Sequence, residues 1–303
     1  MEGNYEPGAY RTFTVREPKP RLISAAPFRD RVVHHALTGV LEPVFERRFT
    51  ADSYACRAGF GTHRALARAR EGCGRYPCVL QCDIRKYFLS IDHQILKDLL
   101  ARVVKCERTL DLAARIIDGS NPQEPAGGWF PGDDLFAPFE RRRGLPLGNQ
   151  TSQFFANVYL NGLDHFVARE LRPGVYVRYV DDFLLFGDDK AALNDMRSSI
   201  EELLDTLRLA LHPGKSRVCR TRDGVSFLGW RLFPEHARLD RSNVTRFRRR
   251  LAALHRGYVE GRVGMEAIET RVLAWIAHAA HGNTWQLRRS VFARYNFTKR
   301  GVV

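Results

Sequence analysis

As far as residue 230, the chain alternates short apolar runs with longer segments in which apolar residues recur every three or four positions. The short runs have the length and the β-branched or aromatic composition of strands, and the longer segments have the period of amphipathic helices. The strand-like runs span 78–84, 175–180 and 183–186, and the helical segments span 95–103, 155–167 and 191–209. We therefore expect α+β or α/β layers, with these helices packed on one sheet.

The last part of the chain has a helical pattern of its own. Apolar residues keep to one face over 244–258 and again over 265–279, and a third helix is expected from Thr284. Ser242 is placed to cap the first of these helices, because its hydroxyl could accept a hydrogen bond from the first turn. The pattern predicts a small helical unit at the C-terminus.

A boundary is expected just before this unit. Phe233–Leu239 contains Pro234 and separates the strand-like pattern from the helical one, so we predict a hinge there. The chain is accordingly divided into a first domain, 1–235, and a basic helical domain, 236–303.

Positive charge is concentrated in the helical domain. Between Asp240 and Val303 there are 13 Lys and Arg but 4 Asp and Glu, so this segment supplies nine of the net +14 charges. Such a segment favours a polyanionic partner, either nucleic acid or, less strongly, an anionic membrane surface, although a solvated basic bundle would look the same. Six arginines on its helices are candidates for phosphate contacts: Arg246, Arg249, Arg250, Arg256, Arg288 and Arg289.

Other features narrow the class of protein. No run approaches 18 consecutive apolar residues, and the N-terminal MEGNYEPGAYRTF is polar, so we expect a cytoplasmic protein with no membrane partner. The six cysteines form no C-x-x-C pair, and a chain of 303 residues can bury a core without disulfides, so free thiols are expected.

The run VYVRYVDDFLLFG, from Val175 to Gly187, places two carboxylates inside an apolar stretch. Asp181 and Asp182 are predicted to lie in a tight hairpin turn, while Asp83 ends another predicted strand. Other Asp-Asp pairs occur at 133–134 and 188–189, so the dipeptide alone does not predict a functional site. Three converging carboxylates require a divalent metal, and two Mg²⁺ ions, or Mn²⁺ instead, would support nucleotidyl transfer by in-line displacement.

These residues resemble the motifs of reverse transcriptases. Tyr179-Val-Asp-Asp182 is similar to the family's Y-x-D-D hairpin, and Asp83-Ile-Arg-Lys-Tyr-Phe88 is similar to the strand with its first metal-binding Asp. The resemblance implies an α+β right-hand polymerase, with fingers and palm built on an antiparallel sheet backed by helices and an all-α thumb. It also implies that Asp83 and Asp181 bind both metal ions, together with the backbone carbonyl of Ile84 and, less clearly, Asp182.

The same resemblance implies further site residues and partners. Template RNA, a DNA primer and dNTPs would be bound, and Phe88 would exclude a ribose 2′-hydroxyl, although a Phe at this position could equally be a core residue. Arg21, with Lys19 beside it, would contact the triphosphate. Lys215 would be a general acid near pyrophosphate, or else a solvated loop lysine. The primer-gripping hairpin would be Phe227, Leu228, Gly229 and Trp230.

One motif departs from the usual pattern of the family. Most reverse transcriptases have Q-G-x-x-x-S-P where this chain has Leu147-Gly148-Asn-Gln-Thr-Ser-Gln153. This form, with segments 29–36 and 52–57, resembles the reverse transcriptases of diversity-generating retroelements. That subfamily is bacterial or phage-encoded, and the resemblance implies error-prone copying opposite template adenine, mutagenic retrohoming, and a small basic accessory protein, monomeric or oligomeric.

Leu147 suggests a physical origin for such errors, because a Gln at this position could hydrogen-bond the nascent pair and Leu cannot. A packing substitution with no effect on fidelity is the alternative. Two further functions stay open: an accurate reverse transcriptase of retron, group II intron or defence type, and a non-catalytic nucleic-acid-binding polymerase fold.

Overall fold

The centre of the molecule is a four-stranded antiparallel sheet. The computed structural model describes residues 5–16, 20–120, 129–295 and 297. The strand order is β4-β5-β3-β6, so the hairpin β4–β5 lies beside β3, which is distant in the sequence. The four strands are β3 (Cys78–Asp83), β4 (Val175–Tyr179), β5 (Asp182–Gly187) and β6 (Arg217–Arg220). The predicted α+β class is confirmed.

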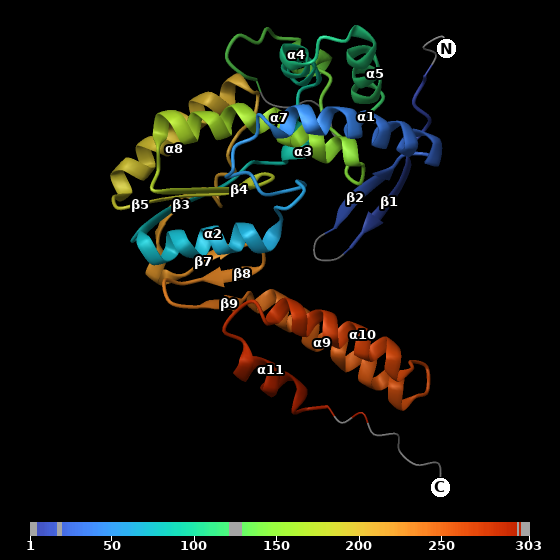
Figure 1. Cartoon of the computed structure of the whole chain (residues 1–303), viewed down its shortest axis with the longest axis vertical. Coiled ribbons are helices and arrows are strands. Elements are labelled where there is room, and N and C mark those ends of the chain that lie inside the picture. Colours follow the sequence, from blue (N-terminus) through green and yellow to red (C-terminus); the bar gives the residue numbers. More distant parts are fainter. Residues whose placement is uncertain (1–4, 17–19, 121–128, 296, 298–303) are drawn as a thin grey trace.

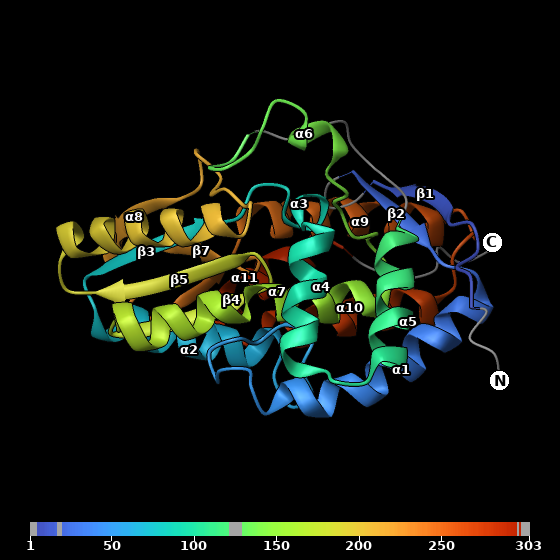
Figure 2. The same cartoon turned by 90° about the horizontal axis from the view of Figure 1, so that it is seen from above.

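Helices cover both faces of this sheet (Figure 1). The helices α7 (Gln150–Phe166), extended by the π-helical turn η1 (Val167–Leu171), and α8 (Lys190–Thr206) lie side by side on one face (Figure 2). The helix α2 (Thr62–Arg75) covers the other, and at Gly72 a Cβ atom would stand 2.5 Å from the ring of Phe186. Alternate strand residues enter the two cores: Leu80 and Cys82 face α7 and α8, whereas Val79 faces α2.

A second layer of helices packs against α7 and carries the N-terminal hairpin. The helix α1 (Phe28–Glu46) packs on α7, and β1–β2 project from its start (Figure 1). The remaining elements of this layer are β1 (Arg11–Val15), β2 (Arg21–Ala25), α3 (Tyr87–Ser90), α4 (His93–Val103), α5 (Glu107–Asp118) and α6 (Ala137–Glu140). The predicted helices at 95–103, 155–167 and 191–209 correspond to α4, α7 and α8.

A three-stranded sheet precedes the C-terminal helices, and it corrects the prediction of a hinge at Phe233–Leu239. After the 3₁₀ turn η2 (Thr221–Asp223), the chain forms β7 (Val225–Phe227), β8 (Trp230–Leu232) and β9 (Ala237–Leu239). These pair in sequence order, so the residues expected to be a hinge form the turn between β8 and β9 and then β9 itself. The boundary placed after residue 235 falls inside this hairpin.

Three helices follow, as the pattern predicts: α9 (Arg241–Val259), α10 (Met265–Ala279) and α11 (Trp285–Phe292). Phe247 of α9 stacks on Trp275 of α10 at 3.9 Å between ring centroids, and Phe292 of α11 packs edge-on against both. The predicted cap Ser242 is wrong. The helix begins two residues earlier, because the backbone carbonyl of Asp240 accepts the N–H groups of Asn243 and Val244.

The cysteines are free, as predicted. Within the described part of the chain, none of the helices combines the length and the apolar character that crossing a bilayer requires.

A buried ion pair joins α7 to the central sheet. The guanidinium of Arg178, from β4, is fully buried and donates to both carboxylate oxygens of Asp164, at 2.6 and 2.5 Å. It also donates to Ser53 Oγ at 2.9 Å and to the carbonyl oxygen of Val180 at 2.9 Å. Such a pair is tolerated only when its remaining donors are also satisfied, and here they bind Ser53, in the loop before α2, and Val180, in the β4–β5 turn.

Breaking this pair should strongly destabilise the protein. We expect Asp164→Asn to lower the free energy of unfolding by about 3–5 kcal/mol, because it leaves a buried guanidinium without its counter-charge. Urea denaturation followed by circular dichroism measures the change. Asp188→Asn, on an exposed residue after β5, is the control and should stay within about 0.5 kcal/mol of the native chain. A loss below about 1 kcal/mol for Asp164→Asn would show that the pair contributes little.

Candidate active site

The β4–β5 hairpin presents its two carboxylates from a tight turn. Asp182 is the first residue of β5 and pairs with Tyr179, so the turn itself is Val180 and Asp181, one residue earlier than predicted. Val180 has a φ of 59°, which is strained for a β-branched side chain. The hydrogen bond from Arg178 to the Val180 carbonyl holds this conformation in place.

The neighbouring strand brings in the third carboxylate. Asp83 ends β3 directly opposite Asp182, and the N–H of Ile84 donates to the carbonyl of Asp181 at 3.0 Å. The side chain of Ile84 is buried, so only its backbone could take part in binding. The three predicted metal-binding aspartates therefore lie together at one end of the central sheet.

The electrostatics of this cluster are unfavourable without a cation. Burial, with the charges of Asp181 and Asp83, raises the pKa of Asp182 to about 8. Burial and the charge of Asp83 also raise the pKa of Asp181. Asp182 Oδ1 is buried and has no hydrogen-bond partner within the described residues. An unpartnered buried carboxylate oxygen beside two more carboxylates fits a divalent metal, for which oxygen is the preferred ligand.

Lys215 places a positive charge in direct contact with the carboxylate cluster. Its Nζ lies 2.8 and 2.7 Å from the two carboxylate oxygens of Asp83. The loop that carries it is fixed to the same strand end, because the N–H of His212 donates to the carbonyl of Asp83 at 2.7 Å. Among the described residues no group of three or more His, Cys, Asp or Glu side chains is arranged to hold a metal ion, and Lys215 is bound to Asp83. Metal binding would therefore have to displace this lysine.

Of the residues predicted to contact the nucleotide, Arg21 and Phe88 are described by the structure. Burial raises the pKa of Asp181, and the charge of Arg21, at the start of β2, opposes this rise, so the N-terminal hairpin acts electrostatically on the carboxylates. Lys19 lies outside the described residues. Phe88 is half-buried in α3 and packs against the core, five positions after Asp83, so its placement agrees with both interpretations of this residue.

The segment Leu147–Gln153 is attached to β2. The Leu147 carbonyl accepts the N–H of Ser24 at 2.9 Å, and Gly148, with a φ of 112°, approaches Ile23 so closely that a Cβ atom would lie 2.8 Å from its Cγ2. Asn149, which the sequence did not single out, donates to the Ser24 carbonyl at 3.1 Å. Gln153 is exposed on α7 and Leu147 is half-buried.

The predicted primer-gripping residues form the β7–β8 hairpin. The side chains of Phe227 and Trp230 are buried in the core beneath it. Leu228 and Gly229, with φ values of 48° and 81°, form the turn and are the part of the motif that a ligand could touch. Contact with a primer strand is thus limited to this turn.

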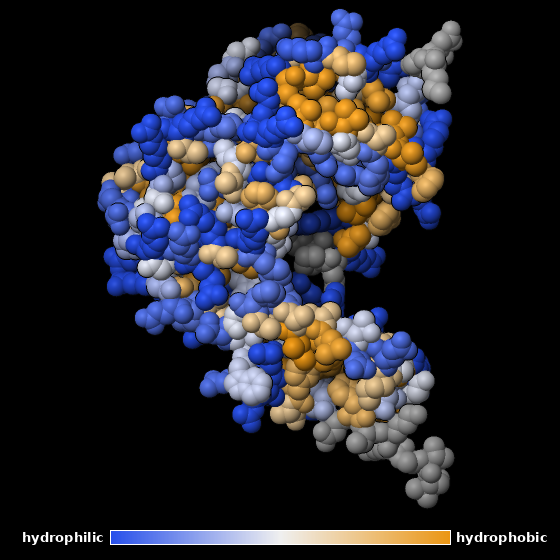
Figure 3. Space-filling view, viewed as in Figure 1, coloured by the Kyte–Doolittle hydropathy of each residue, from blue (hydrophilic) through white to orange (hydrophobic). Residues whose placement is uncertain are grey.

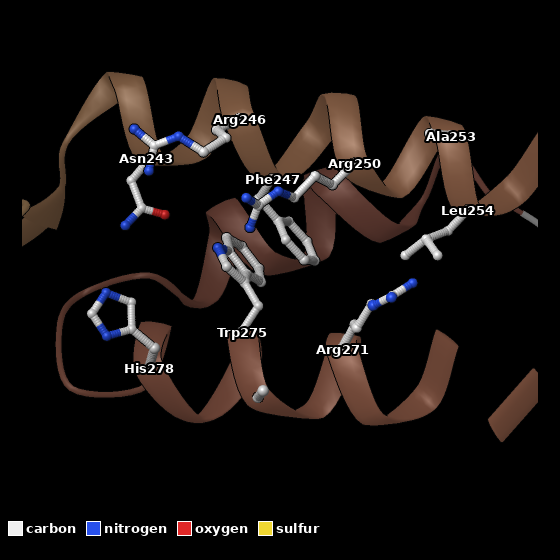
Figure 4. A pocket seen from close by; sticks show the side chains of 10 residues that line it. Asn243, Arg246, Phe247, Arg250, Ala253, Leu254, Arg271, Trp275 and His278 are labelled. Atoms are coloured by element: carbon white, nitrogen blue, oxygen red, sulfur yellow. The ribbon is translucent and has the colours of Figure 1, made fainter. Parts of the chain in front are cut away.

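A basic groove runs between α9 and α10 (Figure 4). Its volume is about 730 Å³, and Arg246, Arg250 and Arg271 extend over it around Phe247 and Trp275. Trp275 Nε1 is buried and has no hydrogen-bond acceptor within the described residues. The guanidinium groups of the three arginines are donors that suit phosphate oxygens.

Arg271, which lies on α10, is a groove residue that the sequence analysis did not predict. The six predicted arginines all lie on α9 and α11. Four predicted arginines do not line the groove. Arg249 and Arg256 are exposed elsewhere on α9, and Arg288 and Arg289 lie over the ring of Trp285.

Comparison with known proteins places this geometry in context. Residues 15–232 match the family described as reverse transcriptase (RNA-dependent DNA polymerase). Protein YkfC of Escherichia coli (strain K12) is 25% identical over 284 residues, covering 80% of this chain and 72% of that protein. The group II intron-encoded protein LtrA of Lactococcus lactis subsp. cremoris is 25% identical over 169 residues, which is 55% of this chain and 26% of LtrA.

Solved structures agree on the fold. Apo telomerase from Candida tropicalis has a TM-score of 0.56 at 11% identity, over 82% of this chain and 54% of that chain. The telomerase of Candida albicans in complex with a fragment of telomeric RNA has a TM-score of 0.53 at 13% identity, over 78% of this chain and 46% of that chain. The chain spans about half the length of these telomerases, and the predicted α+β polymerase fold is confirmed.

Divalent cations should stabilise the protein through its three carboxylates. We expect millimolar Mg²⁺ or Mn²⁺ to raise the Tm, by an amount equivalent to about 1–3 kcal/mol at saturation, because a ligand that binds only the folded state favours folding. Asp181→Asn/Asp182→Asn should lose this response and should melt higher than the native chain without cations, since charge repulsion is relieved.

Differential scanning calorimetry measures both effects. The matched control is Asp188→Asn/Asp195→Asn, which removes two exposed carboxylates outside the cluster and should respond like the native chain. An equal cation response in the two double variants would place the metal site elsewhere.

Proposed function

Because the chain belongs to the reverse transcriptase (RNA-dependent DNA polymerase) family, we propose that it extends a DNA primer along an RNA template at the end of the central sheet. The observation that carries this proposal is the meeting of Asp83, Asp181 and Asp182 next to Lys215, with one buried carboxylate oxygen that has no hydrogen-bond partner among the described residues. Nucleotidyl transfer needs such a cluster, because the reaction develops negative charge at both the attacking and the leaving oxygen.

Each residue of the cluster has a distinct task. Asp83, Asp181 and the Ile84 carbonyl would hold divalent metal ions, Mg²⁺ or Mn²⁺, with Asp182 as a third carboxylate ligand. When bound, these ions would supply Lewis-acid activation of the primer hydroxyl and charge stabilisation at the leaving pyrophosphate. Lys215, displaced from Asp83, would be free to donate its proton to a pyrophosphate oxygen.

The surroundings of the cluster would bind the nucleotide. Arg21 would pair with the triphosphate by charge-assisted hydrogen bonds, with Lys19 as a second cation. Phe88 would restrict the space beside the sugar and so favour dNTPs.

The groove between α9 and α10 would bind the backbone of the template and primer. Arg246, Arg250 and Arg271 offer donors to phosphate oxygens, and affinity gained by counterion release is independent of sequence. The exposed Arg249 and Arg256, and Arg288 and Arg289 on α11, would extend the same basic surface.

At a finer level, we propose that the enzyme is the mutagenic polymerase of a diversity-generating retroelement, copying a dedicated template RNA with errors opposite adenine. Support comes from Leu147 and Gln153, which replace the family's usual Gln and Pro. The carbonyl of Leu147 accepts a hydrogen bond from β2, the strand that begins at Arg21, and this attachment supports a role for Leu147 beside the proposed nucleotide contacts. A small basic accessory protein, as a monomer or an oligomer, belongs to this proposal.

An accurate polymerase of group II intron or retron type is the second candidate. It is favoured by the relatives of this chain, which include a group II intron-encoded protein. The two candidates differ in the spectrum of errors in the cDNA and not in the chemistry of the site.

Primer extension tests the polymerase directly. With an RNA template, a DNA primer, dNTPs and Mg²⁺, the native chain should make cDNA, and Asp181→Asn/Asp182→Asn should reduce the rate at least a hundredfold, because the metal-binding carboxylates are lost. Asp188→Asn/Asp195→Asn is the control and should retain native activity. Equal synthesis by the two double variants would refute this active site.

Sequencing the cDNA tests the finer proposal. The native chain should misincorporate mainly opposite template adenine, and Leu147→Gln should lower that rate severalfold, because Gln restores a polar contact that a mispair leaves unsatisfied. Leu147→Met is the size-matched control and should leave the rate unchanged. If the native cDNA is accurate, the group II intron or retron type is supported. An unchanged error spectrum in Leu147→Gln would show that Leu147 is a packing residue.

A further inference from the structure

The helix α1 mixes polar and apolar side chains on both its buried and its outward face. Its buried face, turned toward α7, carries the polar side chains of Asp30, His34 and Thr38 among its apolar residues. Its outward face carries large apolar side chains beside the exposed Arg29, Arg31, His35 and Glu42. The exposed fractions of these apolar side chains are high: Phe28 75%, Val32 54%, Val40 65% and Val44 44%. A helix on the outside of a monomer normally shows polar residues to water, so this face indicates a partner.

The outward residues form one continuous stripe. Phe28, Val32, Ala36, Val40 and Val44 follow one another at intervals of four positions, so neighbours in the series lie next to each other and the row winds slowly round the helix, by about 40° at each step. Figure 3 shows hydrophobic surface gathered over α1, at the upper right of the molecule. The groove between α9 and α10 lies in a different part of the structure, so the stripe is not part of the basic surface proposed for nucleic acid.

The charges beside the stripe indicate what packs on it. Arg31 and Glu42 are both exposed, lie about three helical turns apart, and therefore share one flank of the stripe. In an antiparallel pair of α1 helices whose twofold axis passes between Ala36 and Leu37, Arg31 of one copy faces Glu42 of the other. Symmetry repeats the pair, so two intermolecular ion pairs form beside one apolar seam.

Both charges are available for this contact. Within the described part of the chain neither Arg31 nor Glu42 has a salt-bridge partner. Arg31 lies over the ring of Phe28 at 5.6 Å, and Glu42 accepts a long hydrogen bond of 3.4 Å from Gln150. Small residues occupy the middle of the seam: Ala36 lies at the axis, and a Cβ added to Gly39 would meet nothing within 4 Å. Two helices can therefore approach closely there.

We propose that the outward face of α1 is a dimerisation surface, on which a second copy of this chain packs its own α1 in the antiparallel direction. A single pair of helices buries less area than a standard interface, so the dimer dissociates in the micromolar range. The two active sites stay accessible, because α1 covers α7 on the side away from the central sheet.

Sedimentation equilibrium of the full chain, between about 1 and 100 μM, tests this dimer; these concentrations bracket the micromolar range expected for a small interface. The native chain should shift from monomer to dimer with rising concentration, and Val32→Glu/Val40→Glu should stay monomeric. Val259→Glu, an equally exposed valine at the end of α9, should dimerise like the native chain. Primer extension by each variant confirms that it is folded.

A charge exchange separates this geometry from other contacts. Arg31→Glu places like charges opposite each other and should weaken the dimer about tenfold, and Arg31→Glu/Glu42→Arg should restore it, since each pair is then reversed. A native chain that stays monomeric up to 100 μM overturns the proposal, whether or not an accessory protein is found to cover α1. A dimer that persists in Val32→Glu/Val40→Glu, or a charge exchange that restores nothing, overturns it as well.

Discussion

The buried ion pair between Arg178 and Asp164 is the contact on which the active site depends. It connects α7 to the C-terminal end of β4, and its remaining donors reach Ser53 and the carbonyl of Val180. The last of these bonds holds a β-branched residue in a left-handed conformation immediately before Asp181. The carboxylate turn is thus fixed by a charge that lies inside the protein, where solvent cannot compete for it.

This rigidity matters because the carboxylate cluster itself opposes folding. Burial and mutual repulsion raise the pKa values of Asp181 and Asp182, so each carries a cost when ionised. The register that places Asp83 opposite Asp182 cannot relax, since every residue of β3 pairs with β5. Lys215 offsets part of the repulsion and does so reversibly, since its side chain is half-exposed and belongs to a loop. The site is therefore stable enough to form and still able to accept cations.

The sequence predicted the elements best where composition and period agree, as in β3, α4 and α8. The aspartates could be predicted because carboxylates interrupt apolar strands. Arg178 is likewise a charged residue inside an apolar strand. Its partner Asp164 lies on a helix, however, and only the packing of α7 on the sheet brings the two side chains together. The hinge at Phe233–Leu239 was predicted wrongly because Pro234 is equally suited to a hairpin turn between two short strands. Ser242 was a wrong cap because Asp, like Ser, is a common capping residue, and the sequence pattern does not show which of the residues just before an amphipathic helix starts it.

The attachment of Leu147–Gln153 to β2 explains how fidelity could change without a change of fold. The backbone of Leu147 and the side chain of Asn149 make the hydrogen bonds to Ser24, and Gly148 permits the close approach to Ile23. None of these contacts uses the side chain at position 147. That side chain can therefore vary between Leu and Gln while the segment stays in place next to the strand that carries Arg21. Under the proposed function, the choice of a polar or an apolar group at this position would alter the discrimination between base pairs and leave these backbone contacts in place.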